Sequence, residues 1–223
     1  MGEAIFDPAY WRHLGRLAPA DRGRGCAWFV GDGSRDWVLR HYRRGGFAAK
    51  LAADRYVWTG EARVRAFAEW RLLDSLWRRG LPVAQPIAAR FRRDRLFYRC
   101  DLLTRRVPQA RPLSALLGGA AAPDPPWGAI GAAVAALHHA GVDHADLNAH
   151  NVLIDARGKI CFIDFDRGRL RAHGRWTMRN LRRLHRSVIK LGAAGSGADL
   201  GSAWNVLMNA YRAAAGEMPP PAA

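Results

Sequence analysis

Hydrophobic residues follow two different periods in the N-terminal half of the chain. Two short apolar runs flank the turn Gly31-Asp-Gly-Ser34 and predict a β-hairpin, whereas between residues 61 and 79 apolar side chains recur at helical spacing until Gly80. Phe67, Trp70, Leu73 and Trp77 are the expected core positions of that helix. The elements predicted for this half are strands 26–30 and 37–42, helix 61–79, and strands 87–91 and 96–103. No defined element is predicted for residues 1–20.

The C-terminal half is dominated by helical periodicity. After Pro112 we predict a short Leu-rich helix, helix 127–140, a hairpin of strands 152–155 and 159–164, and helices 179–191 and 199–213. A small sheet with one helix, followed by a mainly helical part, predicts an α+β protein of two lobes. We expect the lobes to span residues 1–107 and 108–223.

Charge adds information about partners. The chain of 223 residues carries 35 Lys+Arg against 19 Asp+Glu, a net charge of +16, and only three of the 35 cations are lysine. Arginine forks bind phosphate, so nucleic acid, anionic lipid headgroups and phosphorylated substrates are all candidate partners. The three cysteines lack metal-ligand spacing, which predicts buried thiols in a reducing compartment.

Three oxygen-bearing side chains are expected to converge in the C-terminal half. Asp146 and Asn151 are five residues apart on one predicted loop, and Asp164 follows a hairpin that returns the chain to the same place. Amide and carboxylate oxygens suit Mg²⁺, so Asn151 and Asp164 are the expected metal ligands. Asp146 is then left to accept a proton from a substrate hydroxyl during phosphoryl transfer.

These residues also carry a resemblance. The run His144-Ala-Asp-Leu-Asn-Ala-His-Asn151 resembles the catalytic loop of protein kinase-like enzymes, and Asp164-Phe-Asp166 resembles their Asp-Phe-Gly motif. The residues around both motifs, together with the run Gly80-Leu-Pro-Val-Ala-Gln-Pro-Ile87, are similar to the sequences of bacterial 3-deoxy-D-manno-octulosonic acid (Kdo) kinases. The resemblance implies a protein kinase-like two-lobed fold and a bracing role for His144.

The resemblance assigns further positions. Glu69 matches the helix glutamate that orients the cation clamping the nucleotide, and Arg40 is the favoured cation, with Lys50 as a rival. Gly23 and Gly25 stand where a phosphate-covering glycine loop is expected, although the full glycine motif is absent. Independently of the resemblance, Arg167, Arg169 and Arg171 are candidates for contacts with an acidic substrate, because they closely follow the expected metal aspartate, where the chain leaves the cleft.

The activity implied is ATP- and Mg²⁺-dependent phosphorylation of the 4-hydroxyl of Kdo on a lipid A precursor. The protein would bind an anionic membrane surface from the cytoplasmic side of the inner membrane, and no nucleic acid is expected as partner. Asn148 and Asp166 depart from the Ser/Thr protein kinase pattern, and no Ala-Pro-Glu triplet follows, which disfavours a protein substrate. Another kinase of the same fold, or a basic nucleic-acid-binding protein, remain the alternatives; the oligomeric state is left open.

Overall fold

The computed structural model describes residues 2–20, 27–31, 33–43, 54–117, 123–193 and 199–216. The fold is mixed α/β, with an antiparallel sheet and six α-helices among these residues. The chain divides into two compact units. The first unit comprises Met1–Trp77 with Ala84–Arg106, and the second comprises Arg78–Val83 with Val107–Ala223.

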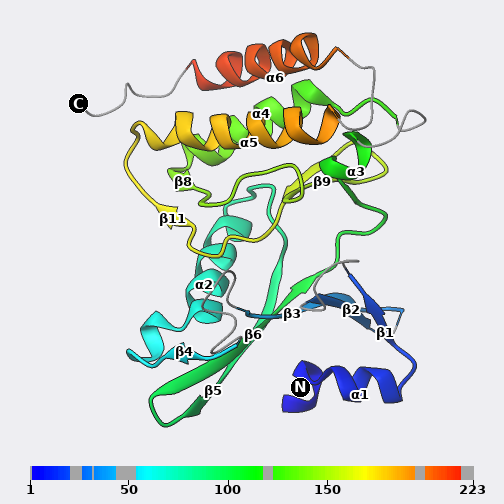
Figure 1. Cartoon of the computed structure of the whole chain (residues 1–223), viewed down its shortest axis with the longest axis vertical. Helices are drawn as coiled ribbons and strands as arrows, with labels where there is room; N and C mark the ends of the chain where they lie inside the picture. The colour runs from blue at the N-terminus through cyan, green and yellow to red at the C-terminus, as the bar shows by residue number, and fades with distance from the viewer. Residues whose placement is uncertain are drawn as a thin grey trace. The chain divides into compact units, whose positions relative to one another are not determined.

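The first unit is built on one antiparallel sheet (Figure 1). Its strands run in the order β1-β2-β3-β6-β4, and β5 pairs with the same central strand, β6. The predicted hairpin is present, with Val30 opposite Trp37. The strand bounds are β1 Leu17–Pro19, β2 Ala27–Gly31, β3 Asp36–His41, β4 Tyr56–Val57, β5 Pro86–Asp94 and β6 Phe97–Arg105.

The predicted long helix is α2, Arg65–Arg78, which begins four residues later than expected because Glu61–Arg63 forms a 3₁₀ turn first. Its buried residues are Ala66, Glu69, Leu73 and Leu76. The expectation that Trp77 lies in the core was wrong, since its side chain is 43% exposed. Three of the four buried positions lie one residue before the expected ones, and one of them is the charged residue Glu69.

The N-terminal residues, for which no element was expected, form part of the first unit's core. They contain a 3₁₀ helix at Glu3–Phe6 and the short helix α1, Pro8–His13, which Asp7 caps by accepting from the N–H of Ala9. Phe6 and Trp11 pack with Trp37, Leu39 and Leu103 on one face of the sheet. Single aromatic residues gave no periodic signal, yet together they cover that face.

The second unit is mainly helical, with α6 packed along α4 and also in contact with α5 (Figure 1). Its helices are α3 Leu113–Leu117, α4 Trp127–His139, α5 Trp176–Gly192 and α6 Leu200–Ala215. Three small strand pairings accompany them, made by β7 Arg111–Pro112, β8 Val142–Asp143, β9 Val152–Ile154, β10 Ile160–Phe162 and β11 Arg169–Leu170. The hairpin predicted at 152–164 is therefore present as β9 and β10.

Two glycines of the second unit allow backbones to approach closely. At Gly131 of α4 an added Cβ would lie 2.1 Å from the carbonyl oxygen of Leu207 in α6, so the two helices pack backbone against backbone. Gly141, with φ +76°, ends α4, and a Cβ there would lie 2.7 Å from the carbonyl oxygen of Arg171. The second contact directs the chain from α4 into β8 and onward to Asp146.

Candidate active site

Asp146 lies in the loop between β8 and β9, and its backbone carbonyl ties this loop together. The side-chain amides of Asn148 and Asn151 both donate to that carbonyl, at 3.0 and 2.9 Å. Asn148 also accepts from the N–H of His150 at 2.8 Å. The Asp146 carboxylate itself is half exposed. The loop therefore holds the backbone of Asp146 and leaves its carboxylate accessible.

The β9–β10 hairpin returns the segment around Asp164 to this loop. The N–H of Ile163 donates to the carbonyl of Asn151 at 3.1 Å, which places Asp164 one residue from a direct link to the loop. Asp164 has φ 62°, a left-handed conformation that is uncommon for a residue other than glycine and often retained at functional sites. Hydrogen bonds thus bring the surroundings of Asp146, Asn151 and Asp164 together.

His144 braces both segments from inside. Its Nδ1 accepts from the N–H of Asp146 at 3.2 Å, and its Nε2 donates to the carbonyl of Ile163 at 3.0 Å, which requires the neutral Nε2–H tautomer. Burial lowers the pKa of His144, so the neutral form is the one present near pH 7. The ring packs against Phe165 with centroids 4.5 Å apart. His144 is therefore a structural brace, as the sequence suggested.

Helix α5 supports the same loop through three residues on one face. Asn180 Oδ1 accepts from the N–H of His144 at 3.0 Å, and Ser187 Oγ accepts from the N–H of Ala149 at 3.1 Å. Between them, Arg183 Nη1 donates to Asp146 Oδ1 at 2.6 Å. None of these three residues was predicted from the sequence; their signal there was polar residues at helical spacing on a helix with an apolar face.

Arg40 and Glu69 meet inside the first unit, together with Tyr42. Arg40 on β3 and Tyr42 just beyond it are two residues apart, so both project from one face of the strand. Arg40 pairs with the carboxylate of Glu69 and donates to Tyr42 Oη at 2.8 Å, while Tyr42 Oη donates to Glu69 at 2.5 Å. Burial raises the pKa of Tyr42, which keeps its phenol protonated as a donor.

Three expected nucleotide-binding positions lie outside the described residues. These are Gly23, Gly25 and Lys50. The pairing of Arg40 with Glu69 is the arrangement expected if Arg40 is the clamping cation.

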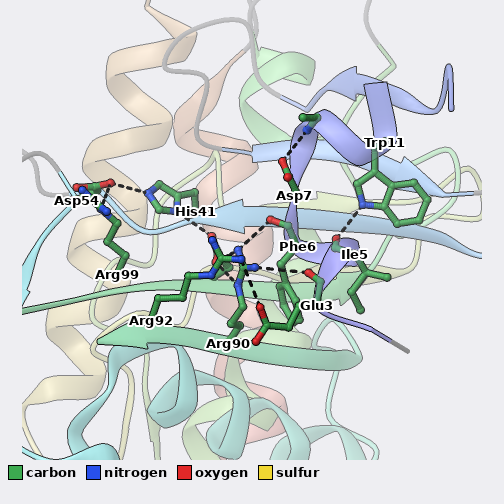
Figure 2. Close-up of polar contacts among 12 residues, drawn as sticks. Glu3, Ile5, Phe6, Asp7, Trp11, His41, Asp54, Arg90, Arg92 and Arg99 are labelled. Carbon is green, nitrogen blue, oxygen red and sulfur yellow. Dashed lines mark hydrogen bonds and ion pairs between the residues drawn. The ribbon is translucent and has the colours of Figure 1, made fainter. Parts of the chain in front are cut away.

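A second polar cluster lies on the opposite face of the same sheet (Figure 2). Arg90 Nη2 pairs with Asp101 at 2.7 Å and donates to the carbonyl of Phe6 at 3.1 Å. His41 bridges Asp101 and Asp54, at 2.7 and 3.3 Å, and the bond to Asp101 is the main reason that its pKa is raised. A cavity of about 330 Å³ opens beside these residues. Arg90 therefore anchors the N-terminal segment to the sheet.

The three arginines expected to meet an acidic substrate differ in their surroundings. Arg171 donates to Asp143 Oδ2 at 3.0 Å, and its N–H donates to the carbonyl of Gly141, so it joins β11 to β8. Arg167 and Arg169 are exposed. Arg171 thus has a structural partner that the sequence did not reveal.

The donor set fits a magnesium ion better than a softer metal. Within the part of the chain that the structure describes, no three His, Cys, Asp or Glu side chains group to hold a metal. Mg²⁺ needs only one or two protein ligands, and completes its shell with water and phosphate oxygens. Asn151 is 8% exposed, and because its Nδ2 is bound to the Asp146 carbonyl, its Oδ1 is the atom left for coordination. One amide and one carboxylate meet this requirement.

The accessible carboxylate of Asp146, held beside an asparagine and the segment of a second aspartate, is typical of enzymes that transfer a phosphoryl group to a hydroxyl. The chain belongs to the lipopolysaccharide kinase (Kdo/WaaP) family, whose model matches residues 8–211. It is accordingly a phosphotransferase that acts on an alcohol group.

Several curated relatives carry the same name, 3-deoxy-D-manno-octulosonic acid kinase. The protein of Xanthomonas oryzae pv. oryzae (strain PXO99A) is 48% identical over 217 residues, covering 96% of this chain and 85% of the relative. That of Xanthomonas axonopodis pv. citri (strain 306) is 47% identical with the same coverage. The protein of Stenotrophomonas maltophilia (strain K279a) is 45% identical over 210 residues, covering 93% and 83%.

Proposed function

We propose that this protein transfers the γ-phosphoryl group of ATP to the 4-hydroxyl of a Kdo residue on a lipid A precursor, in lipopolysaccharide core biosynthesis. The relatives named above support the acceptor. The observation that carries the proposal is the hydrogen bond from Asn151 Nδ2 to the Asp146 carbonyl at 2.9 Å, which joins the proposed metal ligand to the proposed base.

In this mechanism Asp146 accepts the proton of the acceptor hydroxyl as its oxygen attacks the γ-phosphorus of ATP, the bond from that phosphorus to the bridging oxygen breaks, and ADP leaves. Asn151 and Asp164 would hold Mg²⁺, which would neutralise charge on the phosphate oxygens. His144 and Asn180 keep the loop backbone in place, so that little reorganisation is needed when the substrates bind. Positioning and charge neutralisation supply most of the acceleration in such transfers.

The nucleotide-clamping role is assigned to residues 1–107 and the catalytic role to residues 108–223, the two lobes of a kinase-like domain. Arg40 would contact the ATP phosphates, with Glu69 and Tyr42 fixing its orientation. Gly23 and Gly25 would supply backbone amides to the phosphates. Because Tyr42 donates to the same carboxylate oxygen that Arg40 binds, it is proposed as an additional positioning residue.

Peripheral binding at the cytoplasmic side of the inner membrane is part of the proposal. None of the helices in the described ranges combines the length and apolar character needed to cross a membrane. Helix α5 exposes a row of cations together with the apolar side chains of Met178 and Ile189. The exposed cations of α5 are Arg179, Arg182, Arg183, Arg186 and Lys190. A basic face with a few apolar side chains suits an anionic lipid surface.

The test offers radiolabelled ATP and Mg²⁺ with three acceptors: a Kdo-lipid A precursor, an aminoglycoside and a generic protein mixture. Label is expected in the Kdo-bearing lipid alone. Asp146→Asn should reduce transfer by about 10²- to 10⁴-fold, the usual contribution of a general base, while leaving lipid binding intact. Label in the protein mixture only would refute the sugar acceptor, and full activity of Asp146→Asn would refute the assigned base.

A further inference from the structure

Arg183 is the one side chain of α5 whose described contact reaches the carboxylate of Asp146 rather than the loop backbone. Its Nη1 donates to Asp146 Oδ1 at 2.6 Å. Both side chains remain accessible, at 47% and 50% exposed. The proposed base therefore has a cation at its side that solvent, and a bound acceptor, can also reach.

A structural role does not account for this cation. Ion pairs between exposed side chains contribute little to stability, and Asn180 and Ser187 already accept hydrogen bonds from the backbone of the loop. The position of Arg183, bound to the exposed carboxylate of the proposed base, is instead suited to contact with the acceptor.

The guanidinium has capacity for a second anion. It carries five N–H donors in a planar fork, and the bond to Asp146 comes from a single nitrogen. The fork matches a carboxylate, which it binds through two parallel hydrogen bonds. An acceptor that bears a carboxylate near its reactive hydroxyl can therefore meet Arg183 and Asp146 at once.

We propose that Arg183 binds the carboxylate of the acceptor sugar and thereby selects acidic sugars over neutral ones. The inference rests on the proposed function, in which the acceptor is a sugar acid whose carboxylate and reactive hydroxyl belong to the same ring. Binding the carboxylate at Arg183 orients the ring with the hydroxyl toward Asp146.

The experiment compares two acceptors, the native Kdo-lipid A precursor and one whose Kdo carboxyl has been reduced to an alcohol. For the wild-type protein, kcat/KM should be about 10- to 100-fold higher with the native acceptor, as expected for hydrogen bonds to a charged group. Arg183→Gln should lower kcat/KM on the native acceptor by a similar factor and bring the ratio of the two acceptors close to one. Arg183→Lys, which keeps the charge without the fork, should retain part of the preference.

Arg182→Gln is the matched control, because Arg182 is an exposed neighbour on α5 whose described contacts do not include Asp146. It should keep the wild-type ratio of the two acceptors, because a weaker contact with the lipid surface would lower kcat/KM for both acceptors equally. Equal losses on both acceptors in Arg183→Gln would overturn the inference, since Arg183 would then act only through Asp146; so would a wild-type protein that uses both acceptors equally. Failure of the wild type to phosphorylate either lipid would instead refute the proposed function, together with the inference that rests on it.

Discussion

The two units hold their functional groups with different kinds of contact. In the first unit, Arg40 is held by the carboxylate of Glu69 and the neutral phenol of Tyr42, and His41, at the next position of β3, lies between two carboxylates and has a raised pKa. In the second unit, His144 is neutral, and the backbone of the loop around Asp146 is held by hydrogen bonds that involve side-chain amides, a hydroxyl and backbone groups. The first unit thus relies mainly on charged pairs, whereas neutral hydrogen bonds fix the backbone of the loop in the second unit and Arg183 pairs with the exposed carboxylate of Asp146.

This difference has a physical reason. An arginine that is partly buried needs a carboxylate to offset its lost hydration. The backbone of a loop that presents a base can instead be fixed by neutral hydrogen bonds, while the exposed carboxylate of the base pairs with Arg183. Salt does not screen neutral hydrogen bonds as it screens ion pairs.

Asn151→Ala should give the largest effect, because it removes both a proposed metal ligand and a bond to the Asp146 carbonyl. We expect kcat to fall by about 10²- to 10³-fold, as for loss of one electrostatic group in an active site. Steady-state kinetics on the Kdo-lipid A precursor would measure it. Asn148→Ala is the control, since Asn148 donates to the same carbonyl but is no proposed ligand; equal losses in both variants would contradict a metal role for Asn151.

Glu69→Gln tests the charged site of the first unit. It leaves Arg40 and Tyr42 without their shared carboxylate, so kcat/KM for ATP should fall by about 10- to 100-fold. The free energy of unfolding should fall by about 3 kcal/mol, the lower end for breaking a buried ion pair, because Arg40 is partly exposed. Tyr42→Phe keeps the ion pair between Arg40 and Glu69 and should lower the free energy of unfolding by about 1 kcal/mol. If it lowered that free energy by more than Glu69→Gln does, Tyr42 rather than Glu69 would be the main partner of Arg40.

The histidines of the two units predict opposite pH dependences. Burial lowers the pKa of His138 to about 4 and also lowers that of His144, so below pH 6.5 the unfolded chain binds protons that the native state does not. Stability should therefore decline from pH 6.5 to 5, by at most about 1.4 kcal/mol per pH unit for each histidine. Urea unfolding across this range would measure the slope.

His41 should act in the opposite direction. Because its pKa is raised in the folded state, the stability that His41 contributes is fully present below pH 6.5 and is lost as the pH rises through the pKa of the folded state. His41→Gln should make the free energy of unfolding less dependent on pH above pH 6.5, whereas His138→Gln should reduce its dependence on pH below 6.5. If both variants changed the pH dependence in the same range, the contrast between the units would not hold.

Ser187→Ala should give the smallest effect. It removes one acceptor for the N–H of Ala149 and should lower the free energy of unfolding by about 1 kcal/mol, with kcat within about 3-fold of wild type. Thermal unfolding and steady-state kinetics would measure both. A loss of activity without a loss of stability would mean that this contact matters to catalysis more than the neutral network implies.

Sequence separation explains which features could be predicted. Asp146, Asn151 and Asp164 are linked through one loop and one hairpin, so local spacing was enough to bring their segments together. The contacts of α5 join residues 36 to 38 positions apart and depend on how that helix docks, which no local pattern specifies.

The same limit applies to the first unit. The core role of Phe6 and Trp11 depends on a sheet that forms later in the chain. On α2, Glu69 was assigned by resemblance, but its place among the buried positions and the exposure of Trp77 were not predicted. A buried ion pair of this kind cannot be predicted from hydrophobic periodicity, because that method assigns every charged residue to the exposed face.

The close packing at Gly131 makes α6 indispensable to a site that it does not touch. A variant truncated before Leu200 would uncover the α4 backbone at Gly131 and remove Tyr211, whose hydroxyl lies 2.9 Å from His138 Nδ1. The chain continues from α4 through Gly141 into the strand before Asp146. Such a shortened protein would therefore be inactive in an assay although it retained every proposed catalytic and metal-binding residue.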